Sequence, residues 1–205
     1  MIKRVLNAGS GPPSARQLHP VFSRDSWTEI RLDIDPLVKP DLVGSVTDMV
    51  QLVSSAGLDA VWSSHSLEHL RAHEVPQALS EFRRVLKPDG FALITSPDLE
   101  TVASLILERG LDAHVYTSAM GPITPHDMLF GHSDSIERGK VFMAHNTGFT
   151  SSTLGQLLVD ACFETILVKR EQLDLWALAF MPECDKKAIQ SELAAAGLNM
   201  LDHSD

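Results

Sequence analysis

A glycine-spaced turn lies close to the start of the sequence, directly after a short apolar run. The segment VLNAGSGPPS spans Val5 to Ser14 and carries glycines at positions 9 and 11. Glycine lets the backbone approach a ligand closely, and a helix that follows such a turn offers unpaired N–H groups. The chemistry that suits this turn is the binding of a nucleotide cofactor.

The spacing of the glycines disfavours a dinucleotide. The dinucleotide fingerprint is G-x-G-x-x-G, and Ser14 stands where its third glycine would be. Pro12 and Pro13 also remove two N–H donors that a pyrophosphate would use. About twenty residues further along, Asp33 closes the next apolar run and can accept hydrogen bonds from both hydroxyls of a ribose, although a capping role for it stays open. These features favour a nucleoside cofactor, with an NAD-dependent oxidoreductase as the weaker alternative.

Histidines suited to general-base or metal chemistry gather in residues 97–149, a segment rich in glycine, proline, histidine and aspartate. His126, His132 and His145 are suited to remove a proton from an acceptor near neutral pH. Together with Asp127 they also offer nitrogen and oxygen ligands, but their spacing matches no compact ligand motif. We therefore expect no metal, and a plain structural role for these histidines is the other alternative.

The elements that must position these residues alternate between strand and helix. Residues 73–90 show helical spacing of apolar side chains and end at Pro-Asp-Gly. Alternation of this kind implies right-handed crossovers and a parallel sheet with helices on both faces. Short apolar runs predict buried strands at residues 4–8, 29–34, 41–46, 58–64 and 90–96.

The C-terminal part predicts a different connection. Thr150 or Ser151 is suited to cap a helix, and the apolar runs 163–170 and 174–181 follow with only EQL between them. So short a link forces an antiparallel hairpin. Residues 183–205 predict a terminal helix with a frayed tail.

Size and composition exclude several classes of protein. A chain of 205 residues, 44% of them hydrophobic, predicts one domain over residues 1–205. A net charge of −10 without a dense Lys/Arg run argues against nucleic acid and against an anionic membrane surface. No apolar leader-like run follows MIKR, and no run approaches the ~18 to 20 apolar residues that span a bilayer. We expect a soluble, cytoplasmic protein that acts on a small molecule.

Several of these segments resemble one known family. VLNAGSG, IRLDIDP, GSVTDM, DAVWSSHSLEHL and EFRRVLKPDGFALITSPD occur in the order and at the spacing of the class I S-adenosylmethionine-dependent methyltransferases, especially the small type-11-like group. The resemblance covers about Arg4 to Met181. It implies a Rossmann-like α/β fold with a mostly parallel seven-stranded sheet, S-adenosylmethionine as cofactor and methyl transfer to a small-molecule acceptor. A non-catalytic S-adenosylmethionine-binding protein is the alternative.

The resemblance also implies roles for individual residues of the cofactor site. Asn7 stands where the family usually has an acidic residue, and its amide carbonyl can bond the methionine amino group without adding charge. Asp33 is implied to bind the ribose, with Ile34 against the adenine. The other implied positions are Ala8, Gly9, Ser10 and Gly11 beneath the methionine moiety, Asp48 and Met49 at the adenine, and Ser63, Ser64 and His65 near the methionine carboxyl and the methyl group.

Other readings of some of these residues stay open. Asp48 is also suited to cap a helix, and Met49 to pack in the core. His65, His126 and His145 are the candidates for a catalytic base or for substrate positioning, whereas Glu68 and His69 fit a structural hydrogen-bonding role better.

The irregular segment 97–149 is the candidate for a lid over the substrate. The chain starts at its first strand, and many members of the family cover the substrate with helices that precede that strand. We expect apolar side chains of the segment to line the acceptor site instead, namely Met120, Met128, Phe130, Phe142 and Phe149. A homodimer that closes the site stays open.

Overall fold

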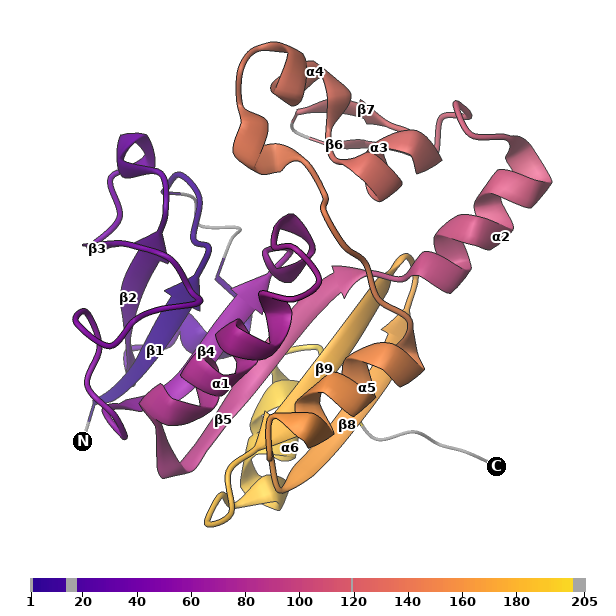
Figure 1. The fold of residues 1–205 in the computed structure, drawn as a ribbon. Coiled ribbons are helices and arrows are strands. Elements are labelled where there is room, and N and C mark those ends of the chain that lie inside the picture. The colour runs from indigo at the N-terminus through magenta and orange to yellow at the C-terminus, as the bar shows by residue number, and fades with distance from the viewer. Residues whose placement is uncertain (1, 14–17, 119, 201–205) are drawn as a thin grey trace, which may run out of the picture.

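A twisted seven-stranded sheet runs through the centre of the molecule (Figure 1). The computed structural model describes residues 2–13, 18–118 and 120–200. The strand order is β3-β2-β1-β4-β5-β9-β8; β9 runs antiparallel to both of its neighbours, β5 and β8, and the other neighbouring pairs are parallel. The strands are β1 (Lys3–Ala8), β2 (Trp27–Asp33), β3 (Leu42–Val43), β4 (Leu58–Ser64), β5 (Leu86–Pro97), β8 (Thr165–Glu171) and β9 (Asp174–Phe180). The predicted parallel sheet ending in an antiparallel hairpin is confirmed.

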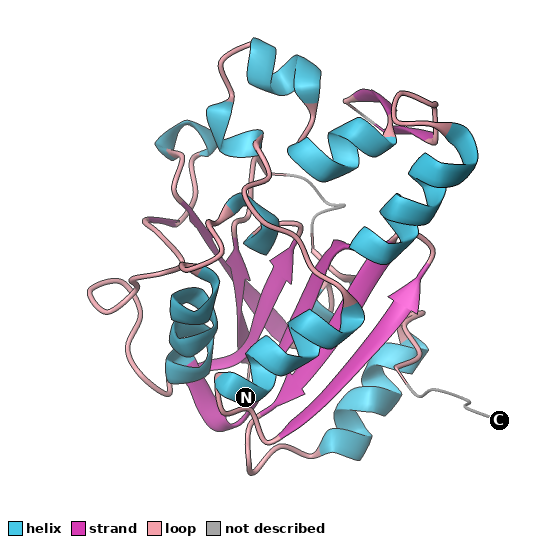
Figure 2. Ribbon diagram, turned by 45° about the vertical axis from the view of Figure 1, so that its right-hand side comes forward, coloured by secondary structure: helices cyan, strands magenta, loops and turns pink. Residues whose placement is uncertain are grey.

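Both faces of the sheet are buried because apolar side chains point alternately to each side along the central strands. On one face, Leu6 and Ile94 pack under α1 (Val75–Val85) and α5 (Ser151–Asp160). On the other face, Val5 and Leu93 pack under the short 3-10 helix η1 (Pro20–Phe22) and under α6 (Lys186–Ala195). Figure 2 shows helices on both sides of the strands, as the alternation predicts.

The structure corrects the expected helix after the glycine turn. Residues 9–13 and 18–26 contain no α-helix, and η1 is their only helical turn; Ser14 lies outside the described residues. Pro12, Pro13 and Pro20 account for this in part, because proline cannot donate the backbone bonds of an α-helix. The strand expected at 41–46 is also shorter than predicted, since it pairs with β2 only at Leu42 and Val43.

Turns replace a helix between β3 and β4, and α1 holds them in place. Glu81 of α1 accepts a hydrogen bond from the N–H of Met49 at 2.6 Å. Arg84 donates to the carbonyl of Val53 at 3.0 Å and also pairs with Glu81. The side chains of one helix thus satisfy the polar groups of the segment that covers this part of the sheet.

The segment 97–149 forms a separate layer beyond the carboxyl ends of the strands, at the top of Figure 1. Asp98 anchors its start: its carboxylate caps α2 through Glu100 N and lies 3.2 Å from Nε of Arg170. A small core of Val102, Ile123 and Met128 stabilises the segment. Its elements are α2 (Leu99–Arg109), β6 (Tyr116–Ser118), β7 (Gly121–Ile123), α3 (Pro125–Phe130), α4 (Ser133–Glu137) and η4 (Val141–Met143). We call this layer the insertion.

The last part of the chain forms the predicted terminal helix, α6, while the tail at 201–205 lies outside the described residues. Among the residues that the structure describes, none of the helices has the length and apolar character needed to cross a bilayer.

Candidate active site

The glycine turn closes against the ends of two neighbouring strands. Gly9 has φ +75° and Gly11 has φ +58°, a region that side chains other than glycine rarely adopt. A Cβ on Gly9 would lie 2.5 Å from Cβ of Ser66, so only glycine fits there. The N–H groups of Gly9 and Ser10 both donate to the carbonyl of Leu32, at 2.9 and 3.0 Å. The turn is therefore fixed in place by β2 and by the loop after β4.

Asp33 ends β2 directly beside this turn. One carboxylate oxygen accepts the N–H of Gly11 at 2.7 Å, and the other accepts the N–H of Asp35 at 2.9 Å. Each carboxylate oxygen has a second lone pair, so the partly exposed Asp33 keeps acceptor capacity. Ile34, the next residue, is half exposed.

Asn7 and Glu29 form a polar pair on adjacent strands that the sequence pattern did not predict. Asn7 is buried, and its Nδ2 donates to Oε1 of Glu29 at 2.7 Å. Since a carboxylate only accepts, the amide nitrogen must face Glu29, and the amide oxygen is the atom left for other partners. Ala8, next to Asn7, packs in the core, while Ser10 is buried with its hydroxyl 3.3 Å from the carbonyl of Gly11.

The two predicted adenine positions point in different directions. Asp48 is exposed, and its Oδ1 accepts the N–H of Val50 at 3.4 Å. Met49 is fully buried and packs in the core under α1. Met49 therefore has the core-packing role that was the alternative to adenine binding. Asp48 does not cap a helix, because no helix begins there.

Ser63, Ser64 and His65 end β4, next to the glycine turn. The hydroxyl of Ser63 lies 2.6 Å from that of Ser66, and Ser64 accepts from Thr95 at 3.2 Å. His65 has φ +48°, which turns its ring out of the strand direction and leaves it about 44% exposed. The carboxyl ends of β1, β2 and β4 thus bring most of the predicted cofactor residues to one edge of the sheet, where open α/β sheets bind ligands.

His65 lies between two carboxylates. Its Nδ1 is 3.3 Å from Oε1 of Glu68, and its Nε2 is 3.5 Å from Oδ2 of Asp174 at the start of β9. Burial alone would lower the pKa of His65, but the carboxylates of Asp174 and Glu68 raise it to about 10. The sequence did not predict the role of Asp174, because its partner is more than a hundred residues away.

Glu68, His69 and His145 meet where the insertion returns to the sheet. Glu68 and His69 belong to the 3-10 helix η3 (Leu67–His69), while His145 follows η4 in the insertion. The rings of His69 and His145 are 4.9 Å apart, and one ligand atom from each of the three residues lies within 4.8 Å of the others. Burial lowers the pKa of His145 and so favours its neutral ring.

The four-residue metal hypothesis from the sequence is not supported by the positions of its members. His145 lies with Glu68 and His69, whereas Asp127 forms a capping box with Thr124 and accepts bonds from Ser133. Burial opposes ionisation of Asp127, but the bonds from Ser133 and Thr124 lower its pKa to about 2. The remaining two are bound to serines: His126 lies 3.3 Å from Oγ of Ser133, and His132 lies 2.8 Å from Oγ of Ser135.

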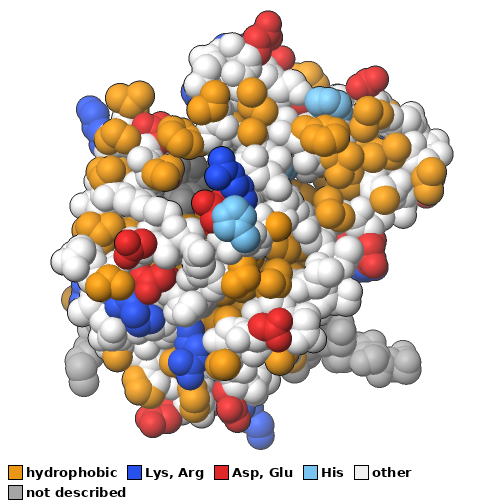
Figure 3. All heavy atoms as spheres, viewed as in Figure 1, with side chains coloured by type: hydrophobic (Ala, Val, Ile, Leu, Met, Phe, Trp, Pro, Cys, Tyr) orange, Lys and Arg blue, Asp and Glu red, His pale blue; other side chains and the backbone are white. Residues whose placement is uncertain are grey.

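Hydrophobic side chains gather on the surface of the insertion in Figure 3. Of the five apolar residues expected to line an acceptor site, Met120, Phe130 and Phe142 are about half exposed. Met128 packs in the small core of the insertion, and Phe149 is buried in the main core. Phe149 thus joins the insertion to the sheet instead of presenting an open apolar surface.

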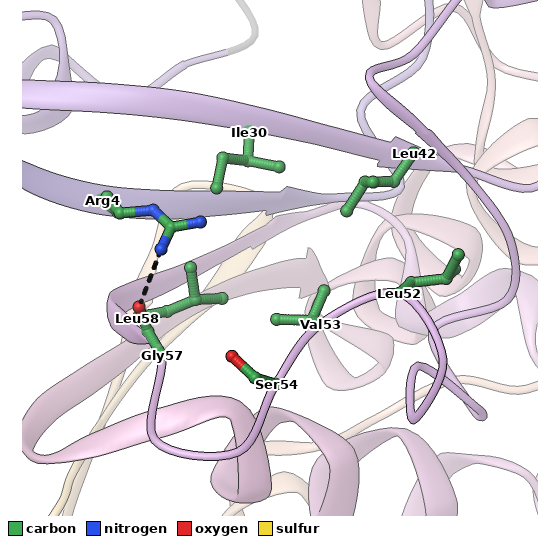
Figure 4. Close-up of a pocket in the computed structure, with 8 residues that line it drawn as sticks. All are labelled: Arg4, Ile30, Leu42, Leu52, Val53, Ser54, Gly57 and Leu58. Carbon is green, nitrogen blue, oxygen red and sulfur yellow. Dashed lines mark hydrogen bonds between the residues drawn. The ribbon is translucent and has the colours of Figure 1, made fainter.

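A cavity of about 170 Å³ lies on another part of the molecule and does not belong to this site (Figure 4). Arg4 and Leu58 line it near the amino ends of β1 and β4, and the other lining residues are Ile30, Leu42, Leu52, Val53, Ser54 and Gly57. The guanidinium of Arg4 donates to the carbonyl of Gly57 at 3.5 Å. The cavity adjoins the turns between β3 and β4, where no helix fills the space.

Comparisons with known proteins agree with the fold. Residues 21–94 match the family model of the methyltransferase domain. No curated protein matches the chain by sequence.

Solved structures of methyltransferases share the fold at low sequence identity. A 1,6-didemethyltoxoflavin-N1-methyltransferase from Burkholderia thailandensis, solved with 1,6-didemethyltoxoflavin and S-adenosylhomocysteine, is 17% identical with a TM-score of 0.54, over 87% of this chain and 71% of that one. A SAM-dependent methyltransferase from Archaeoglobus fulgidus is 15% identical with a TM-score of 0.59, over 87% and 86% of the two chains. A possible histamine N-methyltransferase from Thermotoga maritima is 14% identical with a TM-score of 0.55, over 87% and 82%. This chain therefore has the fold of the class I S-adenosylmethionine-dependent methyltransferases, and its residues 21–94 are similar to the methyltransferase domain.

Proposed function

We propose that this protein transfers a methyl group from S-adenosylmethionine to a small-molecule acceptor by in-line displacement. The observation that carries the proposal is the meeting of the glycine turn, Asp33 and the Ser63 to His65 segment at one edge of the sheet, beneath the insertion. Bound S-adenosylmethionine supplies a methyl group that is already activated on a sulfonium. The protein then has to align the acceptor and exclude water.

The cofactor side of the proposed site fits a nucleoside with an amino acid tail. The spare acceptor capacity of Asp33 suits the two hydroxyls of a ribose, and half-exposed Ile34 beside it offers an apolar surface to a base. Asn7, oriented by Glu29, offers its amide oxygen to an ammonium group. Asn7 has no charge, but the carboxylate of Glu29, which is hydrogen-bonded to the Asn7 amide, supplies a negative charge next to it.

The acceptor side lies between the end of β4 and the insertion. The exposed part of His65 and the apolar side chains of the insertion, Phe130 and Phe142 among them, are suited to contact a small organic molecule. The net charge of −10 disfavours a nucleic acid acceptor. The Burkholderia relative, whose structure holds 1,6-didemethyltoxoflavin, supports an acceptor of similar size. Of the three catalytic candidates, His65 and His145 lie at this edge, while His126 is bound to Ser133 in the insertion.

Calorimetric titration with S-adenosylhomocysteine tests the cofactor assignment, with NAD as a parallel ligand. We expect micromolar binding of S-adenosylhomocysteine and no binding of NAD. Asp33→Ala should weaken that binding by about tenfold or more, since it removes a charged hydrogen-bond acceptor from the ribose. Asp35→Ala is the matched control, because Asp35 also caps a backbone N–H of the same loop, that of Leu37 at 2.9 Å, but is not assigned to the ribose.

Two results would contradict the assignment: equal affinity of the Asp33→Ala variant and the wild type, or tight binding of NAD in place of S-adenosylhomocysteine. A panel of small hydroxyl, amine and carbon-acid acceptors with labelled S-adenosylmethionine then tests turnover. Binding without transfer to any acceptor of the panel would favour a protein that binds the cofactor without catalysis.

A further inference from the structure

Three side chains with metal-binding atoms converge at the junction between the insertion and the sheet. Glu68 and His69 come from η3, directly after β4, and His145 comes from the end of the insertion. The backbone keeps the two segments together, because the N–H of Asn146 donates to the carbonyl of Glu68 at 2.8 Å. The side chain of Asn146 also donates to the carbonyl of His69 at 2.8 Å. The two segments that carry the cluster are therefore joined by hydrogen bonds to the backbone of Glu68 and His69.

Both histidines are oriented as metal ligands usually are. Nδ1 of His69 lies 3.1 Å from the carbonyl of Ala144, and Nδ1 of His145 lies 3.0 Å from the carbonyl of Met128. A carbonyl oxygen only accepts, so in each ring the hydrogen sits on Nδ1 and Nε2 carries the free lone pair. A metal-bound histidine almost always donates its other ring N–H to a carbonyl or carboxylate in this way.

The third member is a buried carboxylate whose oxygens lack hydrogen bonds. Glu68 is 1% exposed, and neither Oε1 nor Oε2 has a hydrogen-bond partner among the described residues. Nδ1 of His65 lies 3.3 Å from Oε1 of Glu68, and Asp174 lies 3.5 Å from Nε2 of the same ring. One imidazole ring thus faces two carboxylates. Burying a carboxylate without sufficient partners is unfavourable, and a bound metal cation would offset this.

We propose that Glu68, His69 and His145 bind a divalent transition metal ion of the Zn²⁺ or Co²⁺ kind. Two imidazole nitrogens and one carboxylate suit such ions, whereas Mg²⁺ and Ca²⁺ prefer oxygen ligands throughout. Bonds of about 2.1 Å place tetrahedral ligand atoms about 3.4 Å apart, so the three atoms draw closer than their present limit of 4.8 Å through side-chain rotation.

An ion bound at this position would have two effects. It ties the insertion to the end of β4 and so fixes the wall above the proposed acceptor site. Three protein ligands also leave a coordination position open, as in catalytic zinc sites. A hydroxyl or carbonyl oxygen of the acceptor can occupy that position. This second consequence rests on the proposed function, while metal binding itself does not.

Cobalt titration of metal-free protein tests the site without any activity assay. Co²⁺ should bind with about one ion per chain, give the visible d–d absorption of a site of low coordination number, and raise the unfolding temperature by mass action. His145→Ala and Glu68→Gln should each weaken Co²⁺ binding by roughly tenfold or more. Loss of a residue that only hydrogen-bonds to a metal ligand already lowers metal affinity by about tenfold, and these two residues are proposed to bind the ion directly. His126→Ala is the control, because His126 is a histidine of the insertion outside the cluster, and it should bind Co²⁺ like the wild type.

The possible results separate this proposal from others. Loss of the band in both cluster variants but not in His126→Ala supports the site, and His69→Ala provides the same test where Glu68→Gln does not fold. Absence of Co²⁺ and Zn²⁺ binding in the wild type would overturn the proposal, as would binding that survives in the cluster variants or a site that takes Mg²⁺ alone. Titration of the same preparations with S-adenosylhomocysteine distinguishes a failure of the metal site from a failure of the cofactor assignment.

Discussion

The burial of His19 makes the free energy of unfolding of this protein fall as the pH falls. The side chain is 8% exposed and lies among the rings of Phe22, Trp62 and Trp176, with centroids 5.7 to 6.4 Å away. Its Nδ1 accepts the N–H of Val21 at 3.2 Å, which requires an unprotonated nitrogen. Burial lowers the pKa of His19 from 6.5 to about 4.

The sign and size of the effect follow from this shift. Between about pH 4 and 6.5 the unfolded chain binds a proton at His19 and the folded chain does not, so the free energy of unfolding falls as the pH falls. The contribution is complete above about pH 6.5 and is lost progressively as the pH drops toward 4. Since each pKa unit is worth about 1.36 kcal/mol, the full difference is roughly 3 kcal/mol, of which about 2 kcal/mol is already lost at pH 5.

Urea unfolding followed by tryptophan fluorescence, at about pH 7.5 and about pH 5, measures this contribution. The matched variant is His19→Asn, because the asparagine oxygen can accept the N–H of Val21 at the start of η1 but does not titrate. We expect the loss of stability between the two pH values to be about 2 kcal/mol smaller in the variant than in the wild type. Equal losses in both proteins would show that His19 does not titrate as its burial indicates.

Three further substitutions test the fold beneath the site. Phe82→Ala, in α1 and fully buried, should lower the free energy of unfolding by about 3 to 5 kcal/mol in urea unfolding, and a drop under about 1 kcal/mol would show that the core is not packed as described. Gly9→Ala should destabilise the protein and weaken S-adenosylhomocysteine binding, because the added Cβ would collide with Ser66. Gly110→Ala is the control, because Gly110 has φ +95° but no atom within 4 Å of an added Cβ, and its effect should be smaller. Equal effects of the two substitutions would show that backbone strain alone, and not the contact with Ser66, accounts for the loss. Thr150→Ala removes the capping box of α5 and should cost about 1 kcal/mol in thermal unfolding, and an unchanged transition would contradict that cap.

The elements of the fold could be predicted from local patterns. The apolar runs, the helical spacing between residues 73 and 90, and the short EQL link each reflect interactions among neighbouring residues, and they led to the observed strands, to α1 and to the hairpin. The helix expected after the glycine turn is absent from residues 9–13 and 18–26, because a glycine turn does not by itself require a helix and the nearby prolines remove backbone donors. Met49 shows a similar limit, since a motif position does not reveal whether its side chain turns toward a ligand or into the core.

By itself, the sequence determined the class of fold, the strand ends that carry the proposed cofactor loop, and the resemblance that implies the cofactor. The tertiary structure alone decided which side chains meet across long stretches of chain: Asn7 with Glu29, His65 with Asp174, and His145 with Glu68 and His69. The physical reason is that periodicity and turn chemistry act over a few residues, whereas these contacts depend on how strands order themselves in the sheet and where the insertion returns to it. Histidines that are equivalent in the sequence, such as His126 and His145, therefore occupy different surroundings in the folded protein.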